Sequence, residues 1–95
     1  MGILDKVRAF IIDTFLFGDD NGLQSDTSFI EGGIIDSTGV MELVAFLEQA
    51  FFVTIADDEL VPDNLDSLAK VAAFVEMKTR YTQPSIVSTQ AVMFA

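Results

Sequence analysis

Residues 32–52 read GGIIDSTGVMELVAFLEQAFF and combine a glycine pair, an acid–hydroxyl pair and a long amphipathic segment. From Ser37 onward the apolar residues recur every three or four positions, which is typical of one buried face of a helix. The members of this face are Val40, Leu43, Val44, Leu47 and Phe51. The pattern predicts a helix from Ser37 to about Phe52.

Two other segments show the same helical spacing. The first ends at Gly18 and has its apolar residues at Leu4, Val7, Ile11, Ile12 and Phe15. The last is expected to use Asn64 or Asp66 as its N-cap and to end near Lys78. Its inward positions are Leu68, Val71, Ala72 and Val75. Between these segments, residues 57–60 predict one or two helical turns, and Pro62 predicts a break.

The chain therefore predicts an all-α fold, a small antiparallel four-helix bundle with three main helices and one short one. A connection over residues 18–36 is expected to be pinned to the core by four apolar anchors. These anchors are Phe29, Ile30, Ile34 and Ile35. We expect one domain at residues 1–80 and a flexible C-terminal tail at residues 81–95, which contains Pro84 and no charge.

The composition excludes several kinds of active site. The chain has neither Cys nor His, which removes a cysteine nucleophile, a Ser–His pair and most transition-metal sites. Fifteen acids against five bases give a net charge of −10. Such a charge disfavours nucleic acid and anionic membranes and favours basic partner surfaces, although it could also serve only solubility. We expect a cytoplasmic location, because no targeting segment and no membrane-spanning run stands out. We also expect a monomer.

Asp36 and Ser37 mark the start of the central helix. A helix N-terminus carries unpaired N–H groups and a partial positive charge, so a phosphodiester attached there is favoured. Ser37 has no histidine to activate it, which indicates an acceptor modified by another enzyme. The alternative is that Asp36 or Ser37 is simply an N-cap.

The wider sequence resembles the acyl and peptidyl carrier protein family. The likeness begins with GIIDSTGVMELV at residues 33–44 and continues with LEQAFFVTI at residues 47–55. The acidic ADDEL at residues 56–60 and PDNLDSL at residues 62–68 follow in the family's order and spacing. The match covers roughly residues 3–78.

The resemblance implies that Ser37 carries 4′-phosphopantetheine, which a Mg-dependent phosphopantetheinyl transferase adds from coenzyme A, with Asp36 as part of the recognition site. The working thiol would then belong to the cofactor. It also implies a docking surface, for which the candidates are Thr38, Met41, Glu42 and Glu48. Burial of Met41 in the core is the alternative for that residue.

Two departures from the family pattern bear on the partners. Thr38 stands where the family most often has Leu, and the central helix has only two acids, Glu42 and Glu48. The DSTGV variant is similar to stand-alone carriers charged by AMP-forming ligases. An acyl or aminoacyl cargo, and a pathway in fatty acid or secondary metabolite biosynthesis, remain open.

Three other sequence features suggest additional sites. Asp66-Ser67-Leu68 matches the family's Asp-Ser-Leu tripeptide, but its context favours Ser67 as a first-turn helix residue. The run DDNG at residues 19–22 lacks the acids of a calcium loop, since Phe17 and Ser28 occupy the required positions. Phe46 and Phe74 are candidate liners of an acyl cleft on spacing alone.

The sequence thus predicts a carrier protein rather than an enzyme. It would hold an acyl or aminoacyl group as a thioester and present it to acyl-transferring partner enzymes. The alternative is an unmodified helical module for protein–protein interaction.

Overall fold

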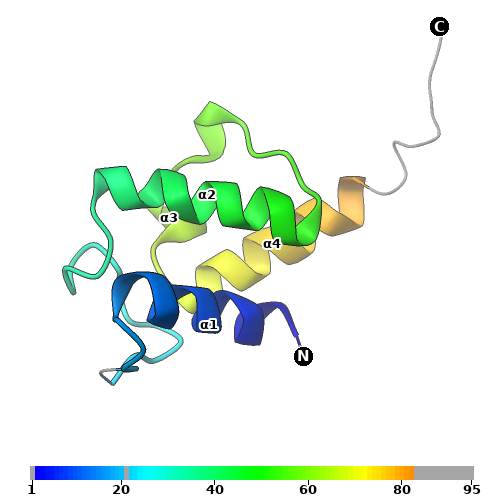
Figure 1. Cartoon of the computed structure of the whole chain (residues 1–95). Helices are drawn as coiled ribbons and strands as arrows, with labels where there is room; N and C mark the ends of the chain where they lie inside the picture. Colours follow the sequence, from blue (N-terminus) through cyan, green and yellow to red (C-terminus); the bar gives the residue numbers. More distant parts are fainter. Residues whose placement is uncertain (1, 21, 83–95) are drawn as a thin grey trace, which may run out of the picture.

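The computed structural model describes residues 2–20 and 22–82, and within them the fold is all-helical (Figure 1). Three long helices are present: α1 (Ile3–Phe15), α2 (Ser37–Phe51) and α4 (Leu68–Thr82). A short helix, α3 (Pro62–Leu65), and a 3-10 turn, η1 (Asp57–Glu59), lie between α2 and α4. The expected bundle of three main helices and one short one is therefore confirmed.

The long helices pack around one core. α1 runs antiparallel to α2 and contacts both α2 and α4 (Figure 1). The fully buried side chains come from all three helices and from the loop between α1 and α2. They are Val7, Ile11, Phe29, Leu43, Leu47, Leu68, Val71 and Val75. Burying such side chains is the main source of stability for short helices, which are marginal alone.

The long loop at residues 16–36 is held by polar contacts as well as by apolar anchors. Arg8 of α1 donates to the Leu23 carbonyl at 2.8 Å and to the Asp20 carboxylate at 3.3 Å. Asp66 accepts from the Ser28 hydroxyl at 2.6 Å and from the Ile30 amide at 3.0 Å. Ile30 is exposed by 54%, so its expected role as a core anchor is wrong. Its backbone, and not its side chain, holds the loop.

The starts of the last two helices differ from the expectation. Pro62 does not break the helical structure but is the first residue of α3, where its missing N–H costs no hydrogen bond. Neither Asn64 nor Asp66 caps α4. The residue before α4 is Ser67, whose hydroxyl accepts from the Lys70 amide at 3.2 Å. Asp66 instead binds the loop, which explains why it is not available as a cap.

The ends of the long helices carry two exposed aromatic rings. Phe17 and Phe52 both adopt the left-handed backbone conformation, with φ of 55° and 57°. α4 continues to Thr82, beyond the expected end near Lys78. Residues 83–95, most of the expected tail, lie outside the described residues.

Candidate functional site

Ser37 is the first residue of α2, and Asp36 is its N-cap. The Asp36 Oδ1 atom accepts a hydrogen bond from the Gly39 amide at 2.7 Å. Because the cap satisfies this amide with a carboxylate, the helix start is stabilised both by hydrogen bonding and by the favourable end of the helix dipole. The Ser37 residue itself is exposed. Asp36 is therefore the cap, and Ser37 is the exposed residue directly after it.

The loop before α2 fixes the direction in which the helix starts. Gly33 turns the chain with φ of +70°, a conformation that favours glycine. The amides of Ile34 and Ile35 then donate to the Phe29 carbonyl at 2.8 and 3.2 Å. With Ile35 buried in the core, the next two residues are held at the surface.

Gly39 permits close packing at this helix start. A Cβ atom at Gly39 would lie 2.9 Å from a Phe15 ring carbon and 3.1 Å from Ile35 Cγ2. Any larger residue would therefore push α2 away from α1. Gly39 therefore allows the first turn of α2 to pack directly against the end of α1.

Ser67, the competing serine, has the opposite environment. It is exposed by only 4%, and its hydroxyl is used to cap α4. A transferase could reach it only after the start of α4 had opened. Ser37 and Ser67 both follow an aspartate in the sequence, but only Ser67 is buried and used as a helix cap.

An apolar cleft begins beside Ser37. Its outer part is a depression lined by Asp36, Ser37, Met41 and four apolar residues. The four are Ile30, Ile35, Val40 and Leu60, and they also line an inner cavity of about 80 Å³. Phe29, Val61, Pro62, Leu65 and Asp66 complete the inner wall. A continuous apolar path therefore leads from Ser37 toward the core.

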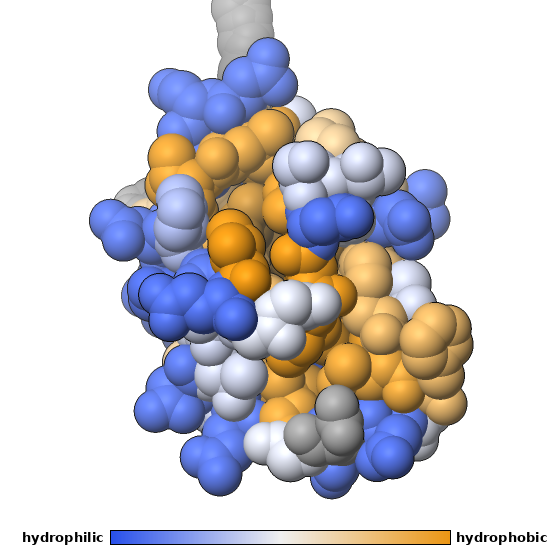
Figure 2. Space-filling view, turned by 90° about the vertical axis from the view of Figure 1, so that its left-hand side faces the viewer, coloured by the Kyte–Doolittle hydropathy of each residue, from blue (hydrophilic) through white to orange (hydrophobic). Residues whose placement is uncertain are grey.

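The surface around Ser37 is more apolar than the net charge suggests. Figure 2 looks at the end of the molecule where α2 begins and shows a band of apolar atoms between hydrophilic residues. Met41 is exposed by 56%, and Thr38 and Glu42 are also exposed. Met41 therefore lies at the surface and is not a core residue.

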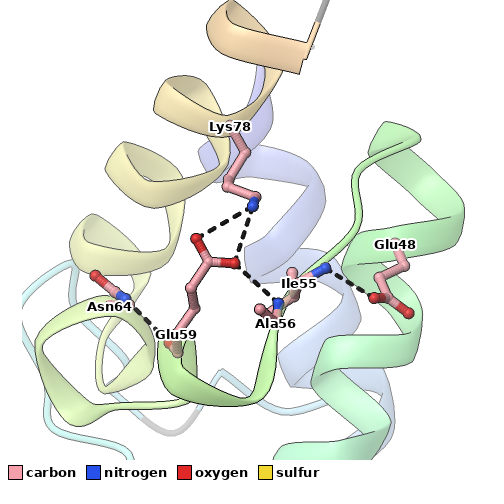
Figure 3. Close-up of polar contacts among 6 residues, drawn as sticks. All are labelled: Glu48, Ile55, Ala56, Glu59, Asn64 and Lys78. Carbon is pink, nitrogen blue, oxygen red and sulfur yellow. Dashed lines mark hydrogen bonds and ion pairs between the residues drawn. The ribbon is translucent and has the colours of Figure 1, made fainter. Parts of the chain in front are cut away.

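Glu48 differs from the other three docking candidates. It is only partly exposed, and its Oε2 atom accepts from the Ile55 amide at 2.9 Å (Figure 3). This contact ties α2 to the segment that leads into η1. Of the two acids in α2, only Glu42 extends freely over the exposed face.

The two phenylalanines suggested as cleft liners lie elsewhere. Phe46 stacks on Phe10 with ring centroids 4.2 Å apart and meets Phe51 edge-on, at the contact between α1 and α2. Phe74 is buried in α4 and lines a groove with Asp63 and Met77. Neither residue lines the cleft beside Ser37, whose walls come from the loop before α2, the first turns of α2, residues 60–61 and α3.

Sequence reasoning missed one partly buried ion pair. The Lys78 Nζ atom donates to both carboxylate oxygens of Glu59, at 2.9 and 3.1 Å (Figure 3). The pKa of Glu59 lies below its ordinary value, mainly because its carboxylate accepts a hydrogen bond from the Ala56 amide. The hydrogen bond from Lys78 is the second cause. The two residues are 19 positions apart, so no helical or turn spacing could have paired them.

The described residues contain neither a metal cluster nor a membrane-spanning helix. Within 2–20 and 22–82, no group of three or more acids is placed to hold a metal ion. The Asp20 carboxylate instead contacts Arg8 and the Gly22 amide. None of the described helices is both long and apolar enough to cross a bilayer.

Comparison with known proteins identifies several relatives. The chain is 36% identical over 71 residues to a Serratia protein named "probable acyl carrier protein PigG", a match covering 75% of this chain and 82% of that protein. It is 35% identical over 74 residues to an acyl carrier protein of Akkermansia muciniphila, covering 78% and 89%. A D-alanyl carrier protein of Streptococcus pyogenes is 27% identical over 73 residues, covering 75% and 92%. No family model matches the chain.

Proposed function

The chain belongs to the acyl carrier protein family, and on this basis we propose that it carries an acyl or aminoacyl group as a thioester on 4′-phosphopantetheine attached to Ser37. The observation that carries the assignment to Ser37 is its exposure at the start of α2, beside an apolar cleft. The cofactor supplies the thiol that this cysteine-free chain lacks.

The attachment is a phosphoryl transfer in which Ser37 is the acceptor. The Ser37 oxygen bonds to the phosphorus that bears pantetheine in coenzyme A, and the bond to the adenosine 3′,5′-bisphosphate leaving group breaks. The hydroxyl proton must pass to a base of the transferase, because this chain has no histidine and the nearby Asp36 oxygen Oδ1 accepts from Gly39. The chain contributes position and exposure, not catalysis.

The site residues fit a phosphodiester at Ser37. The group would lie at the N-terminus of a helix of 15 residues, where the dipole favours negative charge. The apolar path from Ser37 through Val40 and Leu60 could receive the apolar end of a bound cargo. Both features favour a carrier over a module that is never modified.

The proposal includes three kinds of partner. A phosphopantetheinyl transferase would recognise Asp36 and Ser37, an AMP-forming ligase would load the cargo, and acyl-transferring enzymes would receive it. Thr38, Met41 and Glu42 form the proposed docking face of α2, whereas Glu48 supports that face through Ile55. A cytoplasmic location is part of the proposal, since coenzyme A is required and no cysteine calls for an oxidising compartment.

The direct test is the mass of the intact protein after incubation with coenzyme A, Mg²⁺ and a broad-specificity phosphopantetheinyl transferase. We expect one added phosphopantetheine in the wild type and in Ser67→Ala, and none in Ser37→Ala. Circular dichroism must show that Ser67→Ala keeps its helices, because loss of a cap costs about 1 kcal/mol. Modification of Ser37→Ala would refute the site.

The rival function is an unmodified interaction module. It predicts no mass increase in any variant while the protein is folded and a control carrier is modified in parallel. The same experiment therefore separates the two functions.

A further inference from the structure

Glu59 connects three elements of the fold. Its carboxylate receives Lys78 of α4 at 2.9 and 3.1 Å and the Ala56 amide at 2.9 Å (Figure 3). Its backbone carbonyl accepts from the Asn64 side chain of α3 at 3.0 Å. The Lys78 and Glu59 side chains are exposed by only 20% and 26%. The pair is therefore partly shielded from solvent, and it links η1 to α4.

The residues that follow Glu59 form one wall of the cleft. Leu60 lines both the depression at Ser37 and the inner cavity, and Val61 lines the cavity. Phe29 and Ile35, which also line the cavity, are buried in the main core. Leu60 is only partly buried and Val61 is exposed. Leu60 packs against the edge of the core, whereas Val61 does not, so the position of this wall depends both on Leu60 packing and on the polar contacts of the preceding Glu59.

The inner cavity is small in this arrangement. Its volume is about 80 Å³. A cavity of roughly 150 Å³ accepts a benzene molecule, so this one has room for about three carbon atoms. A longer chain would extend beyond this volume unless Leu60 and Val61 moved outward with η1.

We infer that the Glu59–Lys78 ion pair sets the length of cargo that the cleft accepts, by holding the Leu60–Val61 wall in its closed position. This inference rests on the proposed function, since it requires an acyl group tethered at Ser37. A short acyl group fits behind the wall and is shielded from water. A longer one is left outside, where it remains in solvent or in contact with a partner.

To test this inference, a transferase that accepts acyl-coenzyme A attaches acyl-phosphopantetheine to the protein. The donors are acetyl-, butyryl-, hexanoyl- and octanoyl-coenzyme A. The melting temperature of each acylated form is compared with that of the form bearing the free thiol. For the wild type we expect a gain on the order of 5 °C with butyryl and no gain over the free-thiol form with hexanoyl or octanoyl. A gain at every length, or at none, would overturn the inference.

Variants of the ion pair identify its role. In Lys78→Met the hexanoyl and octanoyl forms should also gain melting temperature. In Lys78→Arg the gain should end at the same acyl chain length as in the wild type, which we call the wild-type limit. Arg80→Met is the matched control, because it removes the largely exposed Arg80–Glu76 pair of the same helix. It should also keep the wild-type limit. If Lys78→Met does not fold, Glu59→Gln takes its place.

The outcomes are distinguishable from a failure of the proposed function. If no acyl-phosphopantetheine is added at Ser37, the proposed function fails. If loading succeeds but the ion-pair variants keep the wild-type limit, only the inference about Glu59 and Lys78 fails. If the ion pair were purely structural, its removal would lower the melting temperatures of all forms equally. The longest acyl chain that raises the melting temperature would then stay the same.

Discussion

Asp36 combines a structural task with a proposed recognition task at one carboxylate. Its Oδ1 atom caps α2 through the Gly39 amide at 2.7 Å, directly before the exposed Ser37. A neutral side-chain oxygen can accept the same hydrogen bond, but it cannot supply the negative charge. Substitution by Asn therefore separates the two tasks, and substitution by Ala removes both.

We expect Asp36→Ala to lose about 1 kcal/mol of unfolding free energy, which lowers the melting temperature by roughly 4–8 °C. Asp36→Asn should melt near the wild-type temperature. If the transferase recognises the carboxylate, Asp36→Asn should be modified roughly 10- to 100-fold more slowly, since a charged hydrogen bond contributes about 1.5–3 kcal/mol. Thermal melts and a time course of mass spectra measure both effects. If folded Asp36→Asn were modified at the wild-type rate, the only role of Asp36 would be to cap α2.

At the scale of elements, η1 depends on the ionised form of Glu59. Hydrogen bonds from Ala56 and Lys78 hold the pKa of this carboxyl below its ordinary value of 4.5. The unfolded chain therefore takes up this proton more readily than the folded protein does. It follows that the stabilisation by Glu59 is complete above pH 4.5 and is lost as the pH falls through the lower, folded value.

The expected result is a difference between wild type and Glu59→Gln that depends on pH. At pH 7 the variant should be less stable by about 1 kcal/mol, the usual contribution of a partly exposed ion pair. The difference should shrink as the pH falls from 4.5 through the lower pKa of the folded protein, because below that pKa both proteins carry a neutral side chain at position 59. Urea titrations at a series of pH values give the two free energies. A difference that does not vary with pH would mean that packing, and not charge, is what Glu59 contributes.

The elements differ in how well the sequence predicts them. α2 could be located almost to the residue, because a capping acid precedes a regular apolar stripe that ends at Phe51. α3 and the start of α4 could not, because Pro62 suits a loop as well as a first helical turn. Asp66 also had a partner in Ser28, 38 positions away, that no local pattern reveals.

The candidate site shows the same division. The position of Ser37 followed from the sequence because a helix start is a local property. The cleft beside it did not, because its walls come from the loop before α2, the start of α2, residues 60–61 and α3, which meet only in the folded chain. Phe46 was a candidate on helical spacing, and the structure gives its ring a stacking partner in Phe10 instead.

For the whole molecule, charge repulsion opposes folding. Fifteen acids and five bases leave ten carboxylates in excess even if every base pairs with an acid. Arg8, Lys78 and Arg80 each do so in the structure. The excess charges are spread over a small surface, so they repel one another over distances shorter than the Debye length at low salt, which is about 30 Å at 0.01 M.

Added salt should therefore raise the melting temperature. Screening to about 8 Å at 0.15 M weakens repulsion between surface carboxylates more than it weakens the shielded Glu59–Lys78 pair. Asp13→Asn provides an internal check, because Asp13 is exposed in the last turns of α1, where the helix dipole also disfavours a negative charge. This variant should melt above the wild type at low salt, and the two should converge as salt is added. Differential scanning calorimetry across this range measures both trends, and a melting temperature independent of salt would show that dispersed repulsion does not limit the stability of this fold.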